Sequence, residues 1–69
     1  MSLHLINKLT DNTLLEIKEQ ADGIFLYHIF SNGRVNGDTW HQTLEDAKHQ
    51  ANFQFGNFLT KWENIQPVP

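Results

Sequence analysis

Hydrophobic positions alternate with a period of two in the first half of this chain, and one later segment repeats near 3.6. The clearest run is Ile24–Phe30 (IFLYHIF), which is rich in aromatic and β-branched residues and contains neither Gly nor Pro. It is bounded by Gly23 and by an Asn-Gly pair at 32–33. These features favour a strand, and we predict that Ile24–Phe30 is the central strand of a sheet.

Alternation decides which side chains of this strand share a face. The even-numbered positions from Ile24 to Phe30, His28 among them, fall on one face, and Phe25, Tyr27 and Ile29 fall on the other. Both faces are therefore largely apolar. Since one helix can shield only one of them, the other needs a different cover.

Turn-type clusters recur about every ten residues, at 10–12, 21–23, 31–33 and 36–38, the rhythm of a strand meander. Asn-Gly at 32–33 predicts a type I′ hairpin, after which Arg34 onward pairs antiparallel with the central strand. Segment 13–19 (TLLEIKE) suits a helix or a strand. We predict a strand, because a short Asp22-Gly23 turn leads directly into the next one. Leu3–Leu9 also alternates and predicts an additional strand, with an edge position as one option.

The segment Gly37–Gly56 (GDTWHQTLEDAKHQANFQFG) predicts one amphipathic helix. Thr43 is a good N-cap, and acidic residues at 45 and 46 suit the first turn. Gly56 is predicted to adopt a left-handed conformation and to end the helix. At 100° per residue, one apolar stripe contains Leu44, Ala47, Ala51 and Phe55.

The last segment predicts either a short strand around Lys61–Gln66 or an apolar arm across the core, with Trp62 as an anchor in both cases. Pro67-Val68-Pro69 is expected to terminate any ladder. We therefore predict a single α+β domain over residues 1–69. It has two layers, an antiparallel meander of three to four strands with one helix on one face. The order is β-β-β-α-β, and an extra N-terminal strand is an option.

Length and composition narrow the function. A chain of 69 residues buries only about 60% of its unfolded surface, and small domains gain stability from disulfides, metals or oligomerisation. With no cysteine and a net charge of −3, disulfides and thiolate sites are excluded, and binding to nucleic acid is disfavoured. The N-terminus, MSLHLINKL, resembles neither a signal peptide nor a membrane span. We expect a cytoplasmic protein that does not contact membranes.

Polar residues at the entrance of the helix form the first candidate site: Asp38, Trp40, His41 and His49. Imidazole and carboxylate together suit a divalent metal or a general base, which predicts a small metal- or His-dependent enzyme as the alternative function. The opposing interpretation gives each residue an ordinary role, with Trp40 plugging the core and the other three solvated. His28 is likewise expected to be a hydrogen-bonded core histidine. We favour this interpretation and predict no enzyme, no metal and no cofactor.

Apolar surface is the second candidate site. Phe25, Tyr27 and Ile29 lie opposite the face that the helix covers, and Phe53 falls about 180° from the helix stripe. One interpretation is that the C-terminal arm covers such a surface. The other is that a partner or a second copy does, since added burial stabilises a small core. We predict a non-enzymatic interaction protein that forms a homodimer.

The string Gly37–Gly56 followed by Trp62 resembles a group of short uncharacterised bacterial proteins with a Gly-Asp-Thr-Trp-His entrance, a Leu-Glu-Asp-Ala helix start and a Phe-Gly end. This resemblance implies a compact bacterial α+β domain. The same segment is also similar to the partial RNase-H-like domain of HicB-type antitoxins, in which comparable places are held by Gly37, Thr39 or Thr43, Glu45 and Ala47. The sequence departs from that pattern at Trp40-His41 and lacks an appended DNA-binding segment. That similarity implies strands leading into a helix and a protein-binding role.

Overall fold

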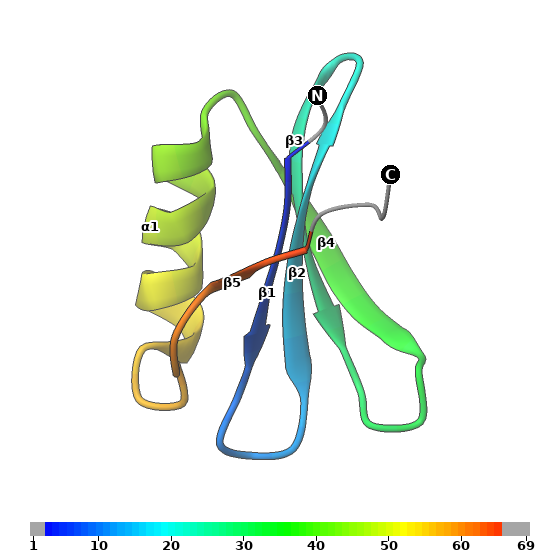
Figure 1. The fold of residues 1–69 in the computed structure, drawn as a ribbon, viewed down its shortest axis with the longest axis vertical. Coiled ribbons are helices and arrows are strands. Elements are labelled where there is room, and N and C mark those ends of the chain that lie inside the picture. Colours follow the sequence, from blue (N-terminus) through cyan, green and yellow to red (C-terminus); the bar gives the residue numbers. More distant parts are fainter. Residues whose placement is uncertain (1–2, 66–69) are drawn as a thin grey trace.

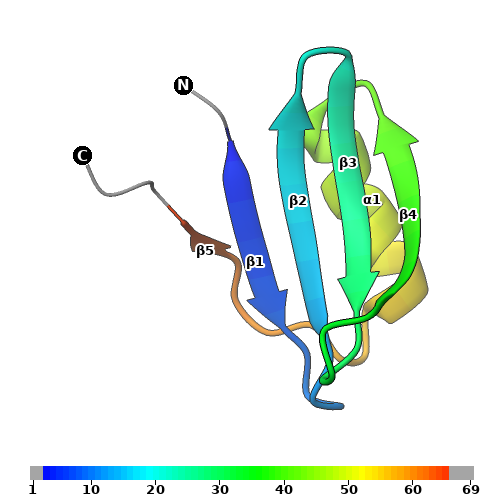
Figure 2. The same cartoon turned by 90° about the vertical axis from the view of Figure 1, so that its right-hand side faces the viewer.

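A computed structural model describes residues 3–65 of the chain as an antiparallel sheet with one helix packed on it (Figure 1). The elements are β1 (His4–Lys8), β2 (Leu14–Gln20), β3 (Gly23–Ile29), β4 (Val35–His41), α1 (Leu44–Phe55) and β5 (Glu63–Asn64). The sheet order is β4-β3-β2-β1-β5, and Figure 2 shows the helix behind the sheet. The α+β prediction is confirmed. The described strands number five, and the element order is β-β-β-β-α-β.

Two predicted strand positions need correction. The central strand is β2, whereas β3 lies one strand from the edge. The extra N-terminal strand exists, but β1 is not an edge strand, because β5 returns to pair with it through Leu5 and Ile6. The final strand is shorter than predicted, and the expectation for Gln66 and the terminal Pro-Val-Pro falls outside the described residues.

The hairpin between β3 and β4 pairs antiparallel as predicted, but its turn differs. The Phe30 N–H donates to the Arg34 carbonyl at 2.8 Å, and the Gly33 N–H donates to the Phe30 carbonyl at 2.8 Å. In this turn Gly33 has a positive φ of 89° and Asn32 does not. The type I′ prediction is therefore wrong, because the connection is a three-residue loop in which only the glycine is left-handed.

The helix begins as predicted. Thr43 has extended φ and ψ, and its hydroxyl accepts the Asp46 N–H at 3.1 Å. The predicted stripe is confirmed, with Ala47 and Ala51 fully buried against the sheet. Gly56, however, has φ −51° and ψ −37°, so the predicted left-handed end is wrong. The chain instead continues through a right-handed turn in which the Phe58 N–H donates to the Phe55 carbonyl at 2.8 Å.

The core lies between the sheet and the helix, and we call this side of the sheet the inner face. Its buried hydrophobic residues are Leu5, Leu9, Leu15, Ile17, Leu26, Ala47 and Ala51. Leu59 and Trp62 of the C-terminal segment pack against the same core, as expected of an anchor. Because that segment joins the inner side, it does not cover the opposite face. No helix within residues 3–65 is long and apolar enough to cross a membrane.

Candidate functional site

The opposite side of the sheet, the outer face, is not covered by the helix (Figure 2). Strand register places Phe25 opposite Trp40 and Lys18, and Tyr27 opposite Glu16 and Asp38. Paired residues in a sheet point to the same side, so these side chains share the outer face. The predicted surface residues Phe25, Tyr27 and Ile29 therefore lie together, as the alternation indicated.

Aromatic and aliphatic side chains concentrate on the β3 and β4 half of this face. The rings of Phe25 and Tyr27 stack with centroids 6.1 Å apart and planes at 22°. Trp40 and Val35 extend the apolar area onto the edge strand, and each exposes more than half of its surface, at 53% and 59% respectively. Phe25, Tyr27 and Ile29 are half-buried, whereas the two edge-strand residues are exposed. Contiguous apolar area of this kind marks interaction surfaces more often than isolated side chains do.

The β1 and β2 half of the outer face is polar. His4 Nε2 lies 2.7 Å from Glu16 Oε2. Lys18 pairs with His4 across the strands, and Ile6 pairs with Glu16. The outer face therefore combines an apolar half with a half that carries both signs of charge.

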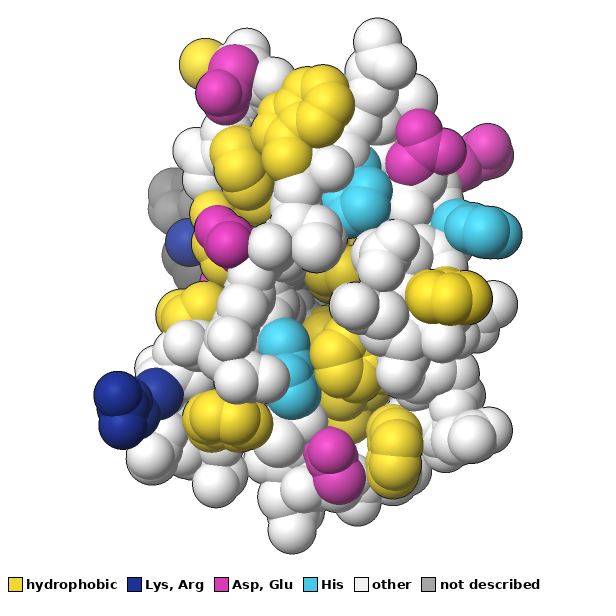
Figure 3. Space-filling view, turned by 180° about the vertical axis from the view of Figure 1, so that it is seen from behind, with side chains coloured by type: hydrophobic (Ala, Val, Ile, Leu, Met, Phe, Trp, Pro, Cys, Tyr) yellow, Lys and Arg dark blue, Asp and Glu magenta, His cyan; other side chains and the backbone are white. Residues whose placement is uncertain are grey.

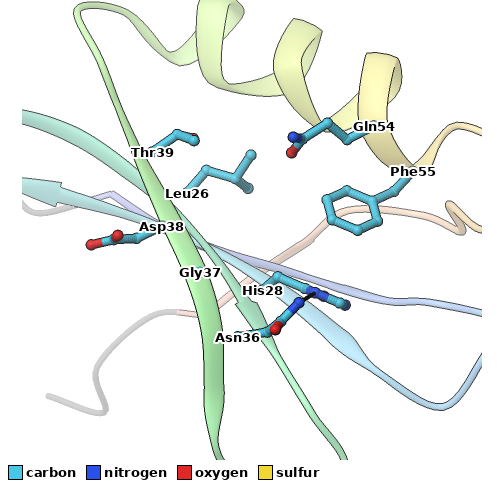
Figure 4. A pocket seen from close by; sticks show the side chains of 8 residues that line it. All are labelled: Leu26, His28, Asn36, Gly37, Asp38, Thr39, Gln54 and Phe55. Carbon is cyan, nitrogen blue, oxygen red and sulfur yellow. Dashed lines mark hydrogen bonds between the residues drawn. The ribbon is translucent and has the colours of Figure 1, made fainter.

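A hollow of about 220 Å³ opens on the inner side, between β4 and the last turn of α1 (Figure 4). Its lining residues are Leu26, His28, Asn36, Gly37, Asp38, Thr39, Gln54 and Phe55. Gly37 lies opposite His28, and a Cβ at Gly37 would meet no atom within 4 Å. The missing side chain keeps this hollow open. Its volume is below the roughly 300 Å³ at which ordinary small-molecule sites begin.

His28 is held by hydrogen bonds at both ring nitrogens. Asn36 Nδ2 donates to His28 Nδ1 at 3.1 Å, and His28 Nε2 lies 2.9 Å from Thr13 Oγ1. The Thr13 hydroxyl in turn donates to Asp11 Oδ1 at 2.6 Å. Because Nδ1 accepts, Nε2 carries the hydrogen and donates to Thr13. The Thr13 proton points to Asp11 and not to the imidazole, so His28 is not placed to act as a base on the Thr13 hydroxyl.

This network also acts on Asp11. Hydrogen bonds from the hydroxyl and the backbone N–H of Thr13 hold the pKa of the Asp11 carboxyl below its ordinary value of 3.8. Such bonds stabilise the ionised form. His28 also packs its ring against Phe55, with centroids 4.6 Å apart. It is thus a half-buried, hydrogen-bonded histidine of the inner face, as expected.

The structure does not assemble the predicted polar site. Asp38 lies on the outer face, His41 pairs with Ile24 on the inner face, and His49 is exposed on the helix. His41 Nε2 lies 2.6 Å from the Thr39 hydroxyl. Among residues 3–65, no three His, Asp or Glu side chains are grouped so that they could hold a metal ion.

Trp40 is not the core plug that its position before the helix predicted. Its indole lies on the outer face, and Nε1–H donates to the Asp22 carbonyl at 3.0 Å. The period-two pattern of β4 continues to His41, so Trp40 falls on the side away from the helix. Phe53 lies where predicted, on the far side of the helix, and is 82% exposed.

The sequence pattern did not predict two features of the sheet. One is β4 itself, where Val35 and Thr39 were not singled out because Gly, Asn and Asp interrupt its apolar pattern. The other is Gly37, which resembled a turn residue but lies within the strand. A signal was present in Val35, Thr39 and Trp40, since β-branched and aromatic residues are enriched in strands.

Comparison of the chain with protein-family models, with characterised proteins and with solved structures found no match.

Proposed function

We propose that this protein is a non-enzymatic interaction protein that self-associates, with the apolar half of its outer face as the contact surface. The observation that carries this proposal is an apolar group on the side of the sheet that the helix does not cover, which consists of half-buried Phe25, Tyr27 and Ile29 and exposed Val35 and Trp40. Covering such a group stabilises a small domain by removing apolar area from water.

The dimensions of the outer face decide how much of it a contact with a second copy must use. The molecule measures 30 × 27 × 21 Å, and the view onto the sheet shows the longest and the shortest of these axes (Figures 1 and 2). A stable interface takes about 800 Å² from each partner, so the contact must extend from the apolar half onto the polar half of the face. Lys18 and Glu16 lie on the outer face beside its apolar half. When a second copy is turned by 180° onto this face, Lys18 of one copy can approach Glu16 of the other, although like charges can also come close.

Light scattering coupled to size-exclusion chromatography tests the proposal over micromolar concentrations. We expect a mass above that of the monomer, and we expect Phe25→Ser and Tyr27→Lys to lower it. Phe53→Ser is the matched control, because it removes an exposed aromatic from the helix instead. Circular dichroism establishes that each variant is folded. A monomer at every concentration, or equal effects of the sheet and helix variants, would contradict the assigned surface.

The enzyme alternative remains a prediction with its own test. Titration with zinc, followed by NMR of the His41 and His49 ring protons, reports any metal binding at the entrance of the helix. Concerted shifts of both rings at micromolar zinc would favour the alternative. The protein-binding role that the resemblance to HicB-type antitoxins implies agrees with our proposal and is likewise open to test.

A further inference from the structure

Among residues 3–65, no second strand pairs with the outer edge of β4. The sheet ends at β4 on one side and at the two-residue β5 on the other. Short edge strands resist pairing with another chain, whereas long ones present a row of unpaired N–H and C=O groups. β4 spans seven residues, contains neither Pro nor Lys, and is exposed at most positions. Figure 3 looks onto this edge and shows hydrophobic side chains and histidines along it, with few basic groups.

Only part of this edge is regular. The pairing with β3 runs from His41 opposite Ile24 to Gly37 opposite His28, after which the register shifts and Val35 lies opposite Ile29. Asn36 is therefore the extra residue of a bulge, and bulges disrupt pairing locally. The regular part of the edge is the five-residue run Gly37–His41.

We propose that two copies of this chain join through Gly37–His41 of β4, antiparallel to each other, with Thr39 opposite Thr39 at the two-fold axis. The two sheets then form one continuous ten-stranded sheet with both helices on the same side. This inference rests on the proposed self-association but assigns it an edge contact in addition to the face contact.

Symmetry limits the registers that are open to such a pair. A two-fold axis perpendicular to the sheet keeps inner faces with inner faces, and residues that pair across antiparallel strands point to the same side. A residue must therefore face its own copy at the axis, because adjacent residues point to opposite sides. Five centres place the axis within the regular run or at its ends: Gly37, Asp38, Thr39, Trp40 and His41.

Four of these centres are disfavoured. An axis at Asp38 sets two carboxylates directly opposite each other, which destabilises a sheet. An axis at Gly37 sets the bulged Asn36 opposite Asp38. An axis at Trp40 leaves a ladder of only three residues, and an axis at His41 leaves a single pair, because β4 ends at His41. The axis at Thr39 uses all five regular residues. It places each Asp38 opposite Trp40 and not opposite the other Asp38.

The side chains on the inner side fit this register. With Thr39 at the axis, His41 of one copy lies opposite Gly37 of the other. Gly37 borders the hollow beside His28 and Thr39, and nothing lies within 4 Å of a Cβ placed on it. The notch that this glycine leaves therefore has room for the imidazole of the opposing chain, and the two-fold axis creates this contact twice.

On the outer side, the same register sets Asp38 opposite Trp40. Within each copy these residues flank Tyr27 and Phe25, so the apolar halves of the two outer faces become neighbours. Edge pairing thus doubles the width of the apolar surface and does not bury it. An edge contact and a face contact can coexist in one assembly.

Single cysteines test the register, because the chain has none of its own. Paired residues in an antiparallel ladder have Cα atoms about 4.5–5.5 Å apart, which is within the roughly 4.4–6.8 Å range of disulfides. Under mild oxidation with copper phenanthroline, we expect Thr39→Cys to form a covalent dimer several-fold faster than Ser31→Cys, an exposed control in the β3–β4 loop. Gly37→Cys distinguishes the neighbouring register, since it cross-links readily only if Gly37 is at the axis.

The unmodified protein supplies a second measurement. In a dilution series followed by amide NMR, we expect the Gly37–His41 amide signals to shift with concentration together with the mass from light scattering. A dimeric mass with Thr39→Cys no faster than Ser31→Cys and with unshifted β4 amides would overturn the edge contact and leave self-association intact. A monomer at all concentrations would overturn both. Preferential cross-linking of Gly37→Cys would overturn the Thr39 register.

Discussion

The indole of Trp40 lies directly over Gly23. A Cβ built on Gly23 would come within 2.1 Å of Trp40 Nε1, and that same nitrogen donates to the Asp22 carbonyl at 3.0 Å. Gly23 begins β3 with a φ of +152°, a conformation that other residues rarely adopt. The start of β3 and the exposed tryptophan of β4 are thus fixed by one contact. Trp40 is a positioned part of the outer face and not a loose side chain.

Replacement of Gly23 by alanine should destabilise the protein through this contact. The methyl group displaces the indole and forces an unfavourable φ, which costs about 1–3 kcal/mol for backbone strain alone. Urea unfolding followed by circular dichroism measures the change. Ser31→Ala, at an exposed position of the β3–β4 loop, is the control. Equal stability of the two variants would contradict the assigned role.

Removal of the Asn7 side chain should loosen the C-terminal segment. Asn7 is fully buried, and its amide donates to the Thr60 carbonyl at 3.1 Å and accepts the Thr60 N–H at 2.8 Å. Asn7→Ala leaves both Thr60 backbone groups without their partner, at a cost of about 1–3 kcal/mol. Hydrogen exchange of the Thr60 amide should accelerate as the free energy of unfolding falls. Asn57→Ala, at an exposed loop position, is expected to change neither.

Loss of the helix cap should have a moderate effect. Thr43→Ala removes the hydroxyl that accepts the Asp46 N–H, and such a change costs about 1 kcal/mol. Thr43→Ser retains the acceptor and should stay within a few tenths of a kcal/mol of the original stability. Thermal unfolding of the two variants gives the comparison. A serine variant as unstable as the alanine variant would show that the hydroxyl is not the cause.

Acid should weaken the β1–β2 turn through Asp11. Its pKa is below the ordinary 3.8 in the folded state because of the hydrogen bonds from Thr13. A carboxyl whose folded pKa is depressed adds stability above its unfolded pKa and loses it as the pH falls through the folded pKa. Asp11→Asn should therefore be less stable at neutral pH and should lose less stability between about pH 5 and pH 2. Parallel pH profiles for both proteins would refute this.

The candidate site was only partly predictable. Period-two alternation was sufficient to place Phe25 and Tyr27 together, because neighbours on one strand face need no knowledge of the rest of the fold. The separation of His41 from Asp38 depended on β4 extending through residue 41, past the point where the sequence indicated a turn. The three-residue spacing of Asp38 and His41 predicted that their side chains lie together. In an extended strand, this spacing puts them on opposite faces.

The sequence by itself determined the helix, its threonine cap, its small-residue stripe and the hairpin strands, because these depend on contacts within a few residues. Only the tertiary structure decided that Asn7 is buried against Thr60, that Gly23 lies beneath Trp40 and that β4 lies at the edge of the sheet. These features join residues far apart in the chain, and their geometry follows from the order and register of strands. No local pattern encodes that order, since it is set by which pairings together bury the core.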